Sequence, residues 1–99
     1  MVRKNGKGKE YNYNGEIEFE GEYLYNYRRK GKTYIYGKLK FEGEFLYNCK
    51  RKGKAYVNRR LEYEGDYLYD KKWNGKGYDN NHIIYQLKDG NGFINTKYF

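Results

Sequence analysis

The sequence predicts an all-β protein: an elongated single-layer antiparallel sheet built from consecutive β-hairpin repeats. The first observation is a repeat of 22 residues, as from Phe19 to Phe41, in which an aromatic-Glu-Gly triplet returns. The second is an alternation of apolar and charged residues inside each repeat. The third is that the segments between the expected strands are too short for a helical crossover, so consecutive strands should pair antiparallel.

The repeat divides the chain into three full units, residues 16–37, 38–59 and 60–81. A divergent N-terminal repeat or cap is expected over residues 1–15, and a partial C-terminal repeat or cap over residues 82–99. The pattern breaks at Leu87, and the segment from there to Phe99 is a cap, a dimerisation strand or the stump of a longer array. The repeat-defining residues are Phe19, Gly21, Gly31 and Tyr34, then Phe41, Gly43, Gly53 and Tyr56, then Tyr63, Gly65, Gly75 and Tyr78.

The first strand of each unit shows the clearest pattern. Ile17, Phe19, Gly21 and Tyr23 alternate with four glutamates, which is typical of a strand buried on one face only. The interior glycine indicates that another backbone or an aromatic ring comes close at that point. The glutamates on the other face are expected to pair with lysines across the strands.

The second strand of each unit is expected to be shorter, over residues 32–36, 54–58 and 76–80. Between the two strands we predict a basic turn that ends in glycine, such as residues 48–53, and between units a turn such as residues 58–60. Turns of the same kind then emerge along one long edge of the sheet, about 10 Å apart.

The motif Phe41-Glu42-Gly43-Glu44-Phe45, followed by Gly53-Lys54-x-Tyr56, resembles the MORN repeat (membrane occupation and recognition nexus). The resemblance covers about residues 16–77, with weaker copies at the ends. The second glycine of the family's Gly-x-Gly is present as Gly77 but replaced by Thr33 and Ala55 in the other units. The resemblance implies an elongated single-layer antiparallel sheet, with lipid-headgroup binding, membrane apposition or protein scaffolding as its role.

Composition limits the function. With 15 tyrosines and 37% hydrophobic residues, the chain suits a thin sheet rather than a dry globular core. The single cysteine allows no intramolecular disulfide, and no apolar run indicates a secretory signal or a membrane span, so we expect a cytoplasmic protein, peripheral to a membrane if it binds lipid. With no serine and one histidine, no hydrolytic triad or metal site is expected, and we predict no enzyme activity, cofactor or small-molecule substrate.

The net charge of +8 indicates a candidate anion-binding edge. Acidic phospholipid headgroups are the first candidate ligand and nucleic acid a weaker one, because binding to either depends on clustered cations. The alternative is that the cations are solvated turn residues that keep the sheet soluble. The candidate residues are Arg28, Arg29, Lys30, Lys32, Lys50, Arg51, Lys52, Lys54, Lys71, Lys72 and Lys76.

Three further residues stand in the predicted turns. Trp73 occupies the position of Arg29 and Arg51, and it is expected either to pack over the neighbouring turn or to contact a membrane or a partner. Cys49 is expected to be a plain surface thiol, and the alternative is that the nearby Lys50 and Arg51 lower its pKa. His82 is expected to be an exposed turn residue. The sequence therefore predicts a non-enzymatic interaction or scaffolding module whose partners are proteins or further copies of itself, bound through exposed edges.

Overall fold

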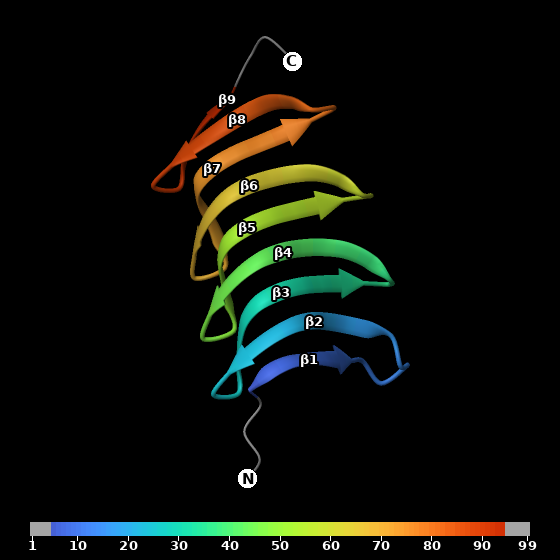
Figure 1. The fold of residues 1–99 in the computed structure, drawn as a ribbon. Helices are drawn as coiled ribbons and strands as arrows, with labels where there is room; N and C mark the ends of the chain where they lie inside the picture. The colour runs from blue at the N-terminus through green and yellow to red at the C-terminus, as the bar shows by residue number, and fades with distance from the viewer. Residues whose placement is uncertain (1–4, 95–99) are drawn as a thin grey trace.

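The structure, a computed structural model, describes residues 5–94 as one open antiparallel sheet of nine strands in sequence order, so the predicted fold class is confirmed (Figure 1). Residues 1–4 and 95–99, which belong to the expected terminal units, lie outside the described residues. The sheet is elongated, with extents of 53 × 27 × 17 Å. Its strands are β1 (Gly6–Tyr11), β2 (Ile17–Leu24), β3 (Tyr27–Ile35), β4 (Lys38–Leu46), β5 (Cys49–Val57), β6 (Arg60–Leu68), β7 (Lys71–Asp79), β8 (His82–Lys88) and β9 (Asn91–Ile94).

A row of glycines crosses the middle of the sheet, each facing the next on the neighbouring strand. The strands curve (Figure 1), and between β4 and β5 the backbones come so close that a Cβ on Gly43 would lie 2.1 Å from the carbonyl oxygen of Lys52. The ring of Phe41 lies over Gly53, where a Cβ would be 2.7 Å from it. The prediction that a backbone and a ring approach the interior glycine is therefore confirmed. The row consists of Gly8, Gly21, Gly31, Gly43, Gly53, Gly65 and Gly75.

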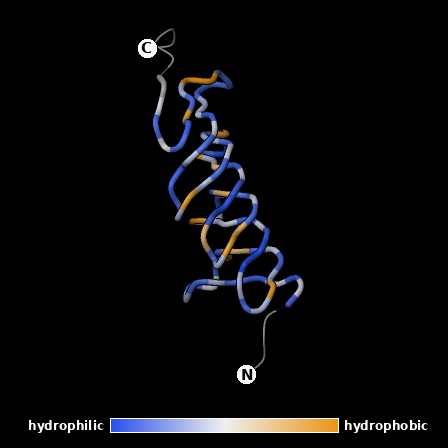
Figure 2. The backbone as a smooth tube through the Cα atoms, turned by 90° about the vertical axis from the view of Figure 1, so that its left-hand side faces the viewer, coloured by the Kyte–Doolittle hydropathy of each residue, from blue (hydrophilic) through white to orange (hydrophobic). Residues whose placement is uncertain are grey.

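The core of the described sheet is a single file of aromatic side chains on one face. Phe19, Phe41 and Tyr63 are 0% exposed, and each packs edge-on against a second ring two positions beyond the glycine of its own strand. The rings form a continuous zigzag with centroids 5.3–5.6 Å apart. Seen edge-on, the chain is one narrow layer in which hydrophobic segments interrupt a mostly hydrophilic tube (Figure 2). The zigzag runs Tyr23, Phe19, Phe45, Phe41, Tyr67, Tyr63.

The connections differ from the prediction. The expected basic turn over residues 48–53 is wrong, because Tyr47 and Asn48 alone make a tight turn and β5 begins at Cys49. Both turn residues have positive φ, 49° and 64°, as a type I′ hairpin turn requires. The second strands are consequently longer than predicted, and the basic residues lie on strands rather than in turns.

The strand pairing also contains a register shift that recurs along the sheet. Each pairing from β2–β3 to β7–β8 contains a shift in register. Within β5 the shift falls at Arg51: Lys52 is opposite Glu44, whereas Lys50 is opposite Phe45. A bulge of this kind turns the strand over, so Lys50 and Lys52 point to opposite faces of the sheet although they are two residues apart.

Candidate functional site

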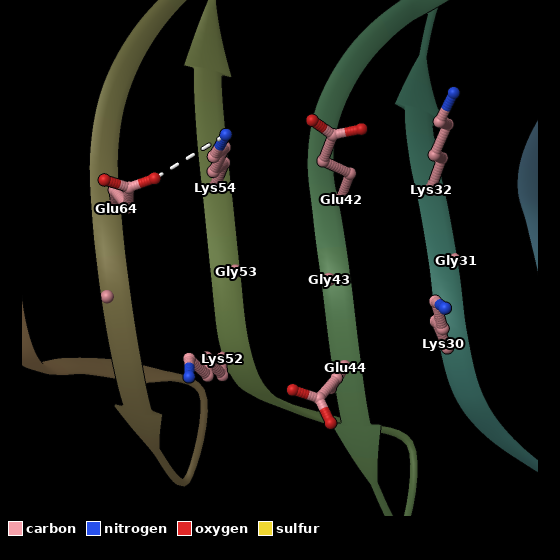
Figure 3. Close-up of a pocket in the computed structure, with 11 residues that line it drawn as sticks. Lys30, Gly31, Lys32, Glu42, Gly43, Glu44, Lys52, Gly53, Lys54 and Glu64 are labelled. Atoms are coloured by element: carbon pink, nitrogen blue, oxygen red, sulfur yellow. Dashed lines mark ion pairs between the residues drawn. The ribbon is translucent and has the colours of Figure 1, made fainter.

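The face opposite the aromatic rings carries a ladder of alternating lysines and acids, which we call the charge ladder. On either side of the glycine row, each lysine of an odd-numbered strand lies opposite an acid of an even-numbered strand (Figure 3). Lys54 and Glu64 form an ion pair at 3.6 Å. The glycines form the floor of a shallow groove between the two rows. The predicted cross-strand pairing of glutamates with lysines is confirmed.

The eleven cations of the predicted anion-binding edge do not share one location. Five of them, Lys30, Lys32, Lys52, Lys54 and Lys76, lie in the charge ladder opposite acids. The placement of these cations in turns along one edge is therefore wrong, because the turns are two residues long and the strands carry the lysines. Their neighbouring acids neutralise most of the positive potential that a polyanion would meet.

Three more of the cations lie over the aromatic rings. Arg28 stacks 4.5 Å from the centroid of Phe19, Lys50 lies 5.1 Å from that of Phe41, and Lys72 lies 5.2 Å from that of Tyr63. Such cation–π contacts contribute on the order of 1 kcal/mol each when partly shielded from water. These side chains thus cover the core, and the remaining three, Arg29, Arg51 and Lys71, are exposed.

Acids hold two of these covering cations in place. Glu10 accepts hydrogen bonds from Arg28, at 2.8 Å from Nε, and from the hydroxyl of Tyr23 at 2.6 Å. Glu62 accepts one at 2.7 Å from Lys72, whose Nζ also lies 3.2 Å from the hydroxyl of Tyr85. Burial opposes the charge of Lys72, but the hydrogen bonds to Glu62 and Tyr85 outweigh it and raise its pKa. Both groups, the one around Glu10 and the one around Glu62, are structural, because their cations cover the aromatic file.

One buried polar atom in this file has no partner. The hydroxyl of Tyr67, a residue that is 8% exposed, makes no hydrogen bond, whereas the Tyr23 hydroxyl at the corresponding position of the first unit donates to Glu10. Burial raises the pKa of Tyr67. An unsatisfied buried hydroxyl costs about 1–3 kcal/mol.

We therefore expect Tyr67→Phe to stabilise the protein by about 1 kcal/mol, because it removes the unsatisfied group and keeps the ring. Phe45 already occupies the corresponding position in the preceding unit. Urea unfolding monitored by the fluorescence of Trp73, the single tryptophan, would measure the change. A loss of stability would show that the hydroxyl has a partner in solution.

An exposed apolar edge is the second feature, and we call it the Leu–Tyr rim. The turns β2–β3, β4–β5 and β6–β7 emerge along the same long edge of the sheet (left in Figure 1). Each presents a leucine and a tyrosine to solvent, and the tyrosines are 59%, 70% and 83% exposed in that order. The rim residues are Leu24, Tyr25, Leu46, Tyr47, Leu68 and Tyr69.

The backbone of these tyrosines is under local strain. Tyr25, Tyr47 and Tyr69 each have φ near 50°, a conformation that bulky residues rarely adopt and that asparagine tolerates well. On the opposite edge, the β3–β4 turn uses Tyr36-Gly37, with Tyr36 at φ 51°, whereas the turns β5–β6 and β7–β8 use Asn58-Arg59 and Asn80-Asn81. The turn geometry therefore does not require tyrosine, and the rim retains it in all three units.

Side-chain hydrogen bonds hold the rim turns in register. The Asn48 side chain accepts a hydrogen bond at 2.7 Å from the backbone N–H of Arg28, one unit back. Asp70 accepts one at 2.7 Å from the N–H of Lys50 in the same way. The expectation that like turns of successive units share one rim is confirmed, and the rim forms a defined row.

The single residues placed in turns by the sequence lie on strands. Trp73 is half-buried on β7. Its ring packs over Gly90 of the β8–β9 turn, which agrees with the expected packing over a neighbouring turn. Cys49 begins β5, and burial together with the Asp70 carboxylate raises the pKa of its thiol, which contradicts the alternative that the nearby cations lower it. His82 is exposed at the start of β8 rather than in the turn.

Within residues 5–94 there is no group of three or more histidine, cysteine or acidic side chains that could hold a metal ion. The same residues include no helix long and apolar enough to cross a membrane. Comparison with protein-family models, with curated protein sequences and with solved structures found no match to this chain.

Sequence reasoning missed the Leu–Tyr rim. A Leu-Tyr pair recurs every 22 residues, at Leu24, Leu46 and Leu68 and the tyrosines that follow them. The recurrence alone did not indicate that these side chains are exposed. The available signal was the position of the tyrosine beside Asn26, Asn48 or Asp70, residues that accept positive φ. An aromatic residue inside a turn dipeptide of this type points to solvent rather than to the core.

Proposed function

We propose that this protein is a non-enzymatic MORN-type repeat module that scaffolds other proteins, and that the Leu–Tyr rim is its docking surface. The observation that carries the proposal is the recurrence of an exposed tyrosine at a strained turn position in three successive units. Strain of this kind costs about 1–3 kcal/mol per residue and persists where something other than stability maintains it. Exposed tyrosines are also among the residues that contribute most to protein–protein binding.

The surroundings of the rim indicate the chemistry of the partner. A shallow groove lies between the turns of the first two units, lined by leucine and tyrosine side chains and by Arg29 and Arg51. Both arginines and Lys71 are exposed. An extended segment with apolar residues about 10 Å apart and acidic residues between them would match this row in spacing and in charge.

Binding to anionic phospholipid is the second candidate, because exposed leucines and tyrosines beside cations also suit a membrane interface. Only Arg29, Arg51 and Lys71 of the eleven candidate cations are exposed outside the charge ladder. At about 1 kcal/mol for each cation near an anionic surface, these three would supply about 3 kcal/mol. That attraction is weak, so the geometry favours a protein partner.

Site-specific photo-crosslinking would test the proposal. With p-benzoylphenylalanine at position 47 in the full-length chain, expressed in the cell in which the protein occurs, we expect one discrete protein adduct. The same group at Tyr36 is the matched control, because Tyr36 has φ 51° and is 84% exposed but lies on the opposite edge. Equal adducts at both positions, or pelleting with anionic vesicles and no protein adduct, would contradict scaffolding through the rim.

Replacing the three rim tyrosines with asparagine would separate function from stability. We expect Tyr69→Asn alone to stabilise the protein by about 1 kcal/mol, because asparagine relieves the strain at φ 50° and the lost ring is 83% exposed. The triple variant Tyr25→Asn, Tyr47→Asn, Tyr69→Asn should stay folded by circular dichroism and lose the adduct formed from a crosslinker at Leu46. Retention of that adduct would show that the tyrosines are not the binding determinants.

A further inference from the structure

The strands of the charge ladder are of two alternating kinds. From β1 to β6, the odd-numbered strands carry Lys-Gly-Lys and the even-numbered strands carry Glu-Gly-Glu or Glu-Gly-Asp, whereas β7 carries Asn74-Gly75-Lys76. Each Lys-Gly-Lys strand inside the sheet lies between two acidic strands, with glycine opposite glycine and lysine opposite acid on both sides. This rule of pairing specifies which strand can lie beside which.

At the N-terminal end of the described sheet, the Lys-Gly-Lys strand has an acidic strand on one side only. β1 carries Lys7-Gly8-Lys9 and pairs with the acidic strand β2 in the usual register. Among residues 5–94, no strand pairs with the other edge of β1. An edge with unpaired backbone groups is a template for an added strand, and here the exposed Lys7 and Lys9 give it a specific charge pattern.

Gly8 is compatible with an added strand of the same acidic kind. Inside the sheet, the row glycines Gly31, Gly53 and Gly75 face the backbone of the preceding strand: a Cβ on Gly53 would lie 2.3 Å from the carbonyl oxygen of Glu42. At Gly8 a Cβ would meet only the Tyr23 ring, nearest at 2.9 Å. The buried Tyr23 ring therefore already favours glycine at position 8, and the same glycine leaves room for the backbone of an acidic strand placed before β1.

We propose that the outer edge of β1 binds, by antiparallel strand addition, an extended segment of another protein that contains Glu-Gly-Glu or Glu-Gly-Asp. In the register of the sheet, the glycine of that segment lies opposite Gly8 and its two acids lie opposite Lys7 and Lys9. Main-chain hydrogen bonds supply the attraction, and the glycine and the two acids supply the selectivity. This site is distinct from the Leu–Tyr rim and does not depend on the function proposed for the rim.

A second folded copy of this chain does not fit the edge. Pairing of two β1 strands about a twofold axis through Gly8 would put Lys7 opposite Lys9 of the other copy, and like charges in direct opposition disfavour the pair. The acidic strands β2, β4 and β6 are paired on both sides inside the sheet. At the other end, β8 has Gln86-Leu87-Lys88 and β9 has Asn91-Gly92, so the alternation stops there.

A labelled peptide with the β6 sequence Arg60–Leu68 (Arg-Leu-Glu-Tyr-Glu-Gly-Asp-Tyr-Leu) would test the proposal against the full chain. We expect saturable binding by fluorescence anisotropy and amide shift changes confined to β1 and β2. Peptides with Glu64→Lys and Asp66→Lys, or with Gly65→Val, should bind at least tenfold more weakly. Shift changes elsewhere in the sheet, or equal binding of the three peptides, would overturn the proposal.

Two variants of the protein complete the test. In Gly8→Ala the new Cβ would lie 2.9 Å from the buried Tyr23 ring and near no described backbone atom, so circular dichroism must first show that the variant is folded. The folded variant should bind the peptide at least tenfold more weakly, because the Cβ blocks the close approach of an added strand. Lys7→Glu with Lys9→Glu should lose the acidic peptide and bind the lysine-substituted one, with Lys88→Glu as a control that changes neither. Unchanged binding by Gly8→Ala, or failure of the reversed pair to bind in a variant that remains folded, would refute strand addition at β1.

Discussion

Gly43→Ala is expected to unfold the protein or to destabilise it by more than about 4 kcal/mol. The new Cβ would lie 2.1 Å from the carbonyl oxygen of Lys52 and 2.6 Å from the Cα of Gly53. Both are backbone atoms, so the clash is relieved only if β4 and β5 separate. Separation in the middle of a single-layer sheet disrupts hydrogen bonds and ring contacts together, and a chain of this length has a total stability of about 5–15 kcal/mol.

The matched control for this change is Gly37→Asn. Gly37 stands in the β3–β4 turn with φ +73°, and a Cβ there would meet no atom within 4 Å. Asn26 and Asn48 hold the same place in the turns of the other edge, with φ of 72° and 64°. We expect a change of less than about 0.5 kcal/mol. Urea unfolding by circular dichroism compares the two variants, and a Gly43→Ala protein as stable as Gly37→Asn would contradict the close approach of β4 and β5.

The sequence was sufficient to predict the sheet because its strongest signals are local and repeated. Alternation from Ile17 to Tyr23 predicts a strand with one buried face, and the structure confirms that Phe19 and Tyr23 are buried. The interior glycine was correctly interpreted as a contact point, since a repeat of 22 residues brings equivalent glycines into line along the sheet.

The turns could not be placed in the same way. Tyr47-Asn48 lacks the glycine that marks most tight hairpin turns, whereas Gly53 five residues later does resemble a turn residue. The sequence therefore predicts a turn that extends to Gly53 and places the lysines before it on an exposed edge. In the structure Gly53 is a mid-strand contact of Gly43, and the same lysines belong to the strand.

The bulges explain why the site residues were misassigned. A period of two places Lys50 and Lys52 on the same face, but the shift at Arg51 turns Lys50 towards the rings of Phe41 and Tyr67. No composition or spacing signal marks a bulge in advance. The sequence thus identified which cations recur, and only the structure separates those that cover the core from those opposite acids and those exposed at the rim.

Phe41→Ala is expected to destabilise the protein by about 3–5 kcal/mol. The Phe41 side chain is 0% exposed and packs edge-on against Phe45 and Tyr67, both at 5.4 Å between ring centroids. It also covers Gly53, and Lys50 stacks on its outer side. A single-layer sheet has no second layer that can move in to fill the space, so the cavity opens to water. The close contact between Gly43 and Gly53, which the Phe41 ring covers, also becomes exposed to water.

The position of Phe41 at the middle of the aromatic file adds a specific consequence. The described strands pair only with their sequence neighbours, so the coupling between the two ends of the sheet passes through the central strands, where the backbone ladder and the aromatic file are the two routes. Loss of the central ring should therefore lower cooperativity as well as stability. We expect hydrogen exchange in Phe41→Ala to accelerate first in β4 and β5, with β1–β2 and β7–β8 opening separately, and the urea m-value to fall.

Two control variants distinguish this explanation from a general effect of losing an aromatic residue. Tyr13→Ala removes a ring that is 97% exposed and should change stability by less than about 0.5 kcal/mol. Phe41→Tyr should be tolerated, because Tyr63 occupies the equivalent place in the next unit and its hydroxyl donates a hydrogen bond at 2.8 Å to the carbonyl oxygen of Asp66. If Phe41→Ala unfolds in one transition with an unchanged m-value, the ring file does not couple the units, and the backbone ladder alone makes the sheet cooperative.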